Sequence, residues 1–169
     1  TTIFIVTLLL LSGCKSAEVA TFREADDPIA LTAEQVQRWD NVKGGGNAQW
    51  ASADYVYSRS VVPENLSQGL SVAGWQGEKV SAQLLVWSAE DLDGVRCEIS
   101  DFRSDNASLR SDIATPHFVR YTLADVSDKS CLCGRANGHP AMLQADMLDN
   151  LERFDIAERT VRPVWISIE

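Results

Sequence analysis

An alternation of apolar and polar residues between Trp75 and Trp87 is the clearest structural signal in the chain. Residues two apart point to the same side of a β-strand. One side of this segment is apolar throughout, with Val80, Ala82, Leu84 and Val86. The other side carries Leu85 and Trp87, which are too apolar for a solvated surface. The segment is therefore predicted to be a central strand that is covered on both faces.

Further segments show the same period of two residues. They predict strands over 95–100, 116–122 and 161–168, and a looser alternation predicts another strand within 50–62. Only a short acidic connection separates Trp87 from Val95, so the strands on either side of it are predicted to form an antiparallel hairpin or a neighbouring pair.

The remaining segments have other patterns. Thr32 and Gln35 have the spacing of a capping box, which predicts a helix through about Trp39 that ends before the glycines at 44–46. Residues 125–140 lack apolar periodicity and are predicted to form a long loop. Residues 142–154 carry apolar side chains at near-helical spacing, although their Asp and Asn residues weaken a helix.

Together these patterns predict an all-β fold, an antiparallel β-sandwich with long irregular loops and a short N-terminal helix. The side chains expected between the two sheets are those on the apolar sides of the predicted strands: Val80, Ala82, Leu84, Val86, Val95, Cys97, Ile99, Val164 and Ile166.

The first residues of the chain have a different character. Residues 1–11 are apolar and uncharged, and they lead into Leu11-Ser12-Gly13-Cys14, which resembles a bacterial lipobox. This predicts a lipoprotein signal peptide at 1–13, a lipidated Cys14, a polar tether at 14–30 and a domain at 31–169. The protein would then be anchored by lipid in a bacterial cell envelope, either periplasmic or surface-exposed. With neither Met nor a basic region before Thr1, we expect the chain to be truncated at this end.

The charge of the chain narrows its range of partners. The formal net charge is −9, from 24 acidic and 15 basic residues. Nucleic acids and anionic membrane surfaces require clustered positive charge, so neither is an expected partner. The acidic residues are scattered along the chain, which is typical of a solvated surface.

Three cysteines remain after Cys14, and an exported protein would meet oxidising conditions. Cys97 could form a disulfide with Cys131 or with Cys133, or these thiols could be free and buried. The spacing of Cys131 and Cys133 does not match a zinc site, and no second pair of ligands exists in the sequence, so no metal and no cofactor is expected.

No catalytic residues are predicted in this chain. Glu90 and Asp91 are adjacent on a short connection and cannot face each other across a substrate. Asp91, Asp93 and Gly94 resemble the start of a calcium loop, but the next residues supply no oxygen ligands. Neither His117 nor any serine lies in the pattern of a nucleophilic site.

Several segments in a fixed order resemble the N-terminal β-sandwich domain of family 123 glycoside hydrolases. They are Trp-Gln-Gly-Glu-Lys-Val-Ser-Ala-Gln at 75–83, Val-Arg-Cys-Glu-Ile-Ser-Asp at 95–101, Phe-Val-Arg-Tyr at 118–121, Cys-Gly at 133–134, Ala-Asp-Met-Leu-Asp at 145–149 and Arg-Pro-Val-Trp-Ile at 162–166. The resemblance covers roughly residues 50–169 and contains no catalytic signature.

The resemblance implies a catalytic TIM barrel after residue 169, so we expect the chain to be truncated at this end too. Such barrels hydrolyse β-linked N-acetylgalactosaminides by a substrate-assisted mechanism with an Asp-Glu pair. The expected partners are thus that barrel, the glycan that it binds, and a membrane through the lipid anchor. The long loop is the expected contact with the barrel, through Cys133, Gly134, His139 and the neighbouring Asp146.

Three functions therefore remain as hypotheses. The chain could be the non-catalytic sandwich module of a lipid-anchored glycoside hydrolase. It could instead be a carbohydrate-binding module, in which aromatic residues such as Trp50, Tyr55 and Tyr57 stack on sugar rings. It could also be a structural surface lipoprotein without a hydrolase domain.

Overall fold

The computed structural model describes residues 6–7, 24–103, 108–124 and 142–169. The helical elements are the α-helix α1 (Ala33–Asp40) and the short 3-10 helix η1 (Ser111–Ile113). The strands are β1 (Val6–Thr7), β2 (Asn47–Ala51), β3 (Val80–Ser88), β4 (Leu92–Val95), β5 (Glu98–Ile99), β6 (Phe102–Arg103), β7 (Ser108–Leu109), β8 (Ala114–Ala124), β9 (Met142–Asp149), β10 (Phe154–Ile156) and β11 (Thr160–Ile168).

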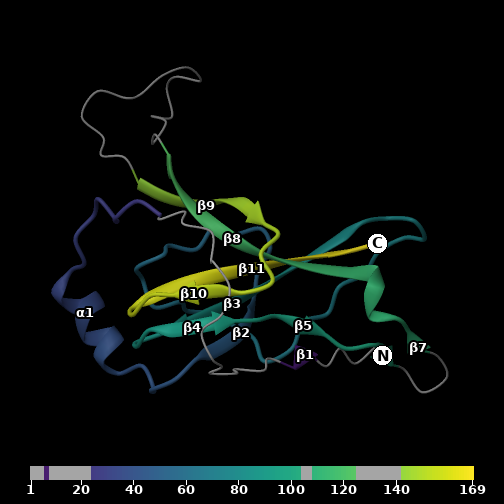
Figure 1. Cartoon of the computed structure of the whole chain (residues 1–169), viewed down its shortest axis with the longest axis horizontal. Helices are drawn as coiled ribbons and strands as arrows, with labels where there is room; N and C mark the ends of the chain where they lie inside the picture. The colour runs from purple at the N-terminus through teal and green to yellow at the C-terminus, as the bar shows by residue number, and fades with distance from the viewer. Residues whose placement is uncertain (1–5, 8–23, 104–107, 125–141) are drawn as a thin grey trace.

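A five-stranded antiparallel sheet in the order β2-β3-β11-β8-β9 forms the main layer (Figure 1). β3 and β11 pair along their whole length, from Thr160 opposite Ser88 to Ile168 opposite Val80. The short strands pair separately, β4 with β10, β5 with β1, and β6 with β7. The prediction of an antiparallel all-β fold with one short N-terminal α-helix is confirmed.

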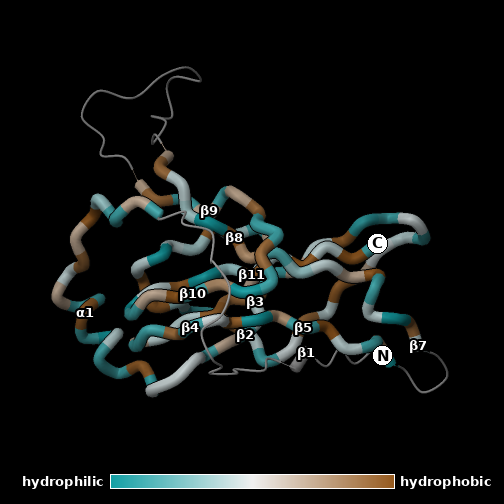
Figure 2. Tube along the Cα trace, in the orientation of Figure 1, coloured by the Kyte–Doolittle hydropathy of each residue, from teal (hydrophilic) through white to brown (hydrophobic). Residues whose placement is uncertain are grey.

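The main hydrophobic core lies between one face of this sheet and the short strands. Figure 2 shows hydrophobic segments along β10 and β11 at the centre of the molecule. The predicted core residues, except Val80, are buried in this core or packed against it: Ala82, Leu84, Val86, Val95, Cys97, Ile99, Val164 and Ile166. Phe118 and Phe154 complete it, with ring centroids 5.5 Å apart. The second layer is a ribbon of short strands rather than a sheet as wide as the first.

The predicted pairing of the strands around Trp87 and Val95 is wrong. β3 already has β2 on one edge and β11 on the other, so neither edge is open to the next segment. The chain turns at Ser88, whose buried hydroxyl accepts a hydrogen bond from the Glu90 N–H (2.9 Å), and enters the other layer. There β4 pairs with β10, with Val95 opposite Phe154. A short connection therefore joins two layers here.

A second apolar cluster covers the opposite face of the sheet, as predicted for a strand buried on both sides. Leu85 and Trp39 are fully buried in it, and Trp87 packs against it. Trp39 comes from α1, whose capping box is present: the Gln35 N–H donates to Thr32 Oγ1, and the Thr32 N–H donates to Gln35 Oε1. Among the described residues, no helix has the length and apolar character needed to cross a membrane.

Three predicted elements differ from the structure. The single strand expected over 95–100 is interrupted, because β4 ends at Val95 and β5 spans only Glu98–Ile99. Residues 142–154 do not form a helix, because β9 pairs with β8 and ends at Asp149 before β10 begins. The apolar residues at near-helical spacing belong to separate segments, because Leu143 lies in β9, Leu151 in the connection and Phe154 in β10. The strand expected within 50–62 is largely absent, since β2 ends at Ala51 and an irregular loop follows.

Candidate functional site

Glu24 and Arg162 form a buried ion pair. Arg162 Nη1 and Nη2 donate to the two carboxylate oxygens of Glu24 over 2.5 and 2.7 Å. The side chains are 3% and 7% exposed, for Arg162 and Glu24 respectively. Such a bidentate pair fixes both position and orientation of the two groups. Glu24 belongs to the predicted polar tether at 14–30. This part of the predicted tether is therefore packed against the β-sheet.

This ion pair fills the gap where two strands of the sheet diverge. Pairing of β11 with β8 ends at Val164 opposite Phe118, next to Pro163, which has no N–H to donate. Beyond that point Arg162 Nη1 donates to the Val119 carbonyl (2.9 Å), and the Tyr121 N–H donates to Glu24 Oε1 (2.8 Å). Side chains thus replace the missing strand-to-strand hydrogen bonds.

The electrostatics of this centre are those of a structural ion pair. Burial works to raise the pKa of Glu24, but the hydrogen bonds and charge of Arg162 outweigh it and lower the pKa below the usual value. The Arg162 guanidinium also lies over the rings of Phe154 and Tyr121, 4.3 and 5.2 Å from their centroids. A general acid in glycoside cleavage needs a raised pKa, so Glu24 is unsuited to that role.

A wide groove lies on the side of the sheet that carries α1. It has a volume of about 850 Å³ and is lined by the loop 52–65, Arg38 and residues 142–144 of β9. The Tyr55 side chain is 63% exposed and meets the Tyr57 ring edge to face, with centroids 5.0 Å apart. The groove is thus large enough for a small-molecule ligand and presents an aromatic surface.

Buried side chains hold the irregular loop that presents Tyr55. Gln83 is 6% exposed, and its Nε2 donates to the carbonyls of Ser52 (2.7 Å) and Tyr55 (3.1 Å). The Tyr121 hydroxyl donates to the Tyr57 carbonyl (3.1 Å), and the Ser52 N–H donates to Tyr57 Oη (3.2 Å). The polar position that Gln83 occupies in β3 therefore has a structural purpose.

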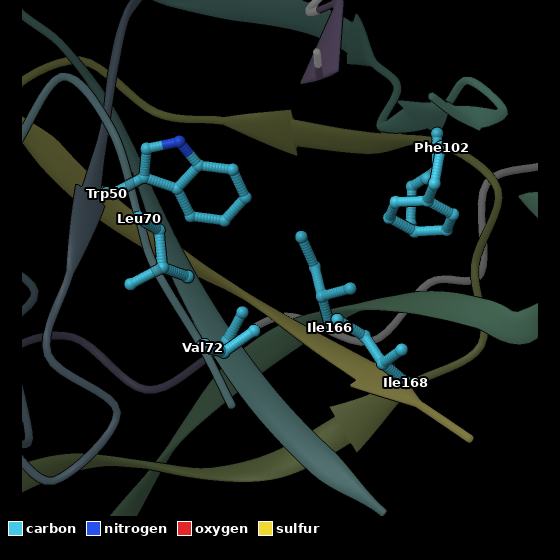
Figure 3. Close-up of a pocket in the computed structure, with 8 residues that line it drawn as sticks. Trp50, Leu70, Val72, Phe102, Ile166 and Ile168 are labelled. Carbon is cyan, nitrogen blue, oxygen red and sulfur yellow. The ribbon is translucent and has the colours of Figure 1, made fainter. Parts of the chain in front are cut away.

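A smaller apolar pocket opens between the two layers, near the last residues of β11. Figure 3 shows Trp50, Phe102 and Ile166 facing a common space, with Leu70, Val72 and Ile168 around it. Its volume of about 20 Å³ is close to that of a single water molecule and is too small for a sugar ring. Trp50 is used here in packing, so it does not join Tyr55 and Tyr57 in one aromatic surface.

The predicted site residues fall into two groups. Cys14, Cys131, Cys133, Gly134 and His139 lie outside the described residues, as does the long loop that was expected to contact a barrel. Cys97 and Asp146 are described. Cys97 is partly buried against the core, and burial, followed by the charge of Glu98, raises its pKa to about 11. Asp146 lies exposed on β9.

The disulfide of Cys97 stays a prediction, because both of its expected partners lie outside the described residues.

The register places Ala124 and Met142, which flank the long loop in sequence, opposite each other at one end of β8. Ile168 pairs with Ala114 at the other end of that strand. The strand ends beside the loop are therefore about 30 Å from the end of β11, given the usual rise per residue.

Asp91 and His117 have structural positions. Asp91 Oδ1 accepts a hydrogen bond from the Glu158 N–H (2.7 Å) and so supports the turn before β11. His117 lies within β8, and its buried Nδ1 has no hydrogen-bond partner among the described residues. In the same part of the chain, no group of three or more His, Cys, Asp or Glu side chains could hold a metal ion.

Sequence reasoning missed the Glu24–Arg162 centre. A signal was present, because Arg162 is the one charged residue of β11, and a buried arginine requires a partner of opposite charge. Its partner could not be found this way, since Glu24 is 138 residues away in sequence.

Comparisons with known proteins place this fold. No curated protein matches the chain. Among solved structures, a family 123 glycoside hydrolase from Clostridium perfringens, described in a study of glycolipid glycan hydrolysis, matches with a TM-score of 0.57 and 18% identity. The match covers 73% of this chain and 21% of that chain, so this chain spans about a fifth of its relative. The model of the glycoside hydrolase 123 N-terminal domain matches residues 50–169. The chain therefore belongs to the family of glycoside hydrolase 123 N-terminal domains.

Proposed function

We propose that this chain is the non-catalytic supporting domain of a larger glycoside hydrolase that acts on β-linked N-acetylgalactosaminides. The observation that carries the proposal is the family match over residues 50–169, combined with the coverage of only 21% of the related hydrolase. The remainder of such a protein would contain the catalytic barrel and would bind the glycan. The study of the Clostridium perfringens protein concerns glycolipid glycans, which supports a glycan substrate of this kind.

The described residues support a role without chemistry of their own. Glycoside cleavage needs a proton donor with a raised pKa, placed opposite a second carboxylate or an acetamido group. The buried carboxylate of Glu24 is instead paired with Arg162, and its pKa is lowered. The domain would therefore contribute folding, positioning and attachment to the membrane through a lipid on Cys14.

Hydrolysis of an aryl β-N-acetylgalactosaminide tests this proposal. Residues 14–169 alone should show no turnover, and the same chain extended by its natural C-terminal continuation should hydrolyse the substrate. Turnover by the short chain, repeated with an independent preparation, would show that the chemistry lies in this domain. An extended protein that is folded but inactive on this substrate would contradict the proposed activity.

Attachment through lipid is tested separately in a bacterial host. A precursor with a complete signal sequence should partition into detergent, and Cys14→Ser should move it to the aqueous phase. Equal partitioning of the two proteins would contradict the proposed anchor.

The groove beside Tyr55 favours a second candidate function, binding of a glycan by this domain. An exposed aromatic ring on a loop held by Gln83 can stack on the apolar face of a sugar, and polar side chains of the groove can bond its hydroxyls. Calorimetric titration with N-acetylgalactosamine and its oligosaccharides tests this function. Tyr55→Ala should abolish the binding, whereas Trp75→Ala, which also removes an exposed aromatic ring, should preserve it. No heat of binding with the unmodified domain would refute this candidate.

A further inference from the structure

Trp75 is the large apolar side chain most exposed to solvent among the described residues, at 86%. It stands in a tight turn, in which the Glu78 N–H donates to the Trp75 carbonyl (3.0 Å) and Glu78 Oε2 accepts from the Trp75 N–H (2.8 Å). Gly77 has φ of +82°, a conformation that is strained for other residues. The turn is therefore well defined, although the indole that it presents contacts little.

This turn lies beside the point where β11 ends. β3 begins at Val80, directly after the turn, and Val80 pairs with Ile168. Lys79 forms an ion pair with Glu169, and the Glu169 N–H donates to the Ile113 carbonyl (2.9 Å). In Figure 1 the C-terminal end of the chain and the segment before β3 lie together, on the side of the molecule away from α1. A residue after Glu169 would begin beside Lys79, which directly follows the Trp75 turn.

The same end of the domain carries other apolar groups. Leu109 of β7 is 59% exposed and lies two residues before η1, to which Glu169 is hydrogen-bonded. Val72 and Ile168 line the small pocket that opens between the layers near this end (Figure 3). Trp75 and Leu109 each lie four residues in sequence from a residue that contacts Glu169, Lys79 and Ile113 respectively. Large exposed apolar side chains are a feature of interaction sites.

We propose that the Trp75 turn, together with Leu109, is the surface on which the polypeptide that follows Glu169 docks. This inference rests on the proposed function, because it requires a following domain. The occupant is identified by position: the chain leaves β11 beside this surface, and the related hydrolase extends far beyond the part that this chain matches. The tryptophan would be the anchor of the junction, since a large rigid ring buries much apolar area at little entropic cost.

Hydroxyl-radical footprinting with mass spectrometry tests the docking surface, because it reads each tryptophan separately. Trp75 should be oxidised severalfold more slowly in the extended protein than in residues 14–169. Tyr55, which is also exposed but lies in the groove beside α1, should be oxidised equally in both. Equal oxidation of Trp75 in the two proteins would overturn the proposal.

A matched pair of variants gives an independent measure. In the extended protein, Trp75→Ala should increase the rate of limited proteolysis after residue 169 severalfold, and Tyr55→Ala should leave it unchanged. In the short chain, Trp75→Ala should leave the unfolding midpoint unchanged, because the side chain makes few contacts there. An unchanged proteolysis rate for Trp75→Ala would contradict the docking role.

The outcomes separate this inference from the proposed activity. Protection of Trp75 in an extended protein that does not hydrolyse the glycan would keep the docking surface and refute the activity. Hydrolysis without protection of Trp75 would do the reverse. Protection of Trp75 in the short chain that increases with protein concentration would identify a second copy as the occupant and overturn the proposal.

Discussion

Replacing Glu24 with glutamine should remove a large part of the stability of this domain. The carboxylate is 7% exposed and accepts two hydrogen bonds from Arg162, which is 3% exposed, and one from the Tyr121 N–H. Glutamine keeps the shape of the side chain but leaves the Arg162 charge buried without compensation. Removing one partner of a buried ion pair typically lowers the free energy of unfolding by about 3 to 5 kcal/mol. We expect Glu24→Gln to lower the free energy of unfolding by this amount at neutral pH.

The effect should depend on pH in a defined direction. The pKa of Glu24 is lowered in the folded state, so the unfolded chain binds a proton at this carboxyl more readily. The stabilisation is therefore fully present above the unfolded pKa of about 4.3, and it is lost as the pH falls through the folded pKa. The difference between the unmodified domain and Glu24→Gln should be constant from neutral pH down to mild acid and then shrink.

Urea unfolding of residues 14–169, followed by tryptophan fluorescence, measures both quantities. Glu34→Gln is the matched control, because Glu34 also pairs with an arginine, Arg38, but is 74% exposed, and we expect a loss below about 1 kcal/mol. If Glu24→Gln is too unstable to fold, Glu24→Asp should retain part of the stability. Equal small losses for Glu24→Gln and Glu34→Gln, or a difference that does not shrink in acid, would refute the reasoning.

Two further predictions follow from burial. Leu84→Ala should lower the free energy of unfolding by about 2 to 5 kcal/mol, because Leu84 is only 4% exposed. Leu123→Ala, at a position that is 56% exposed, should change it by less than about 0.5 kcal/mol in the same assay. Equal effects of the two substitutions would contradict the central position of β3. After reduction, Cys97 should react slowly with iodoacetamide at pH 8 and faster towards pH 11, because burial raises its pKa to about 11. Peptide mapping by mass spectrometry separates Cys97 from the other cysteines, and rapid alkylation of Cys97 in the folded protein at pH 8 would contradict this.

The sequence by itself determined the long strands β3, β8 and β11 of the main sheet and the buried sides of β3 and β11. It did not determine the shorter ones, because the strict alternation over 95–100 is divided between β4, which ends at Val95, and β5 (Glu98–Ile99). In β3, Ala82, Leu84 and Val86 pack in one apolar cluster and Leu85 in the other, as the two-residue period requires. The capping box at Thr32 likewise determined where α1 begins, because its hydrogen bonds join residues three apart. These features are local, so a single sequence contains the information that they need.

Only the tertiary structure decided which strands are neighbours and how the charged residues are paired. β3 pairs with β11 rather than with the segment that follows it, because long-range pairing occupies both of its edges. β9 is a strand because β8 offers a free edge, which its own apolar spacing does not reveal. Glu24 looks like part of a polar tether until Arg162 is placed beside it. Each outcome depends on contacts between residues far apart in sequence, and the energy of such contacts exceeds the local preferences of the chain.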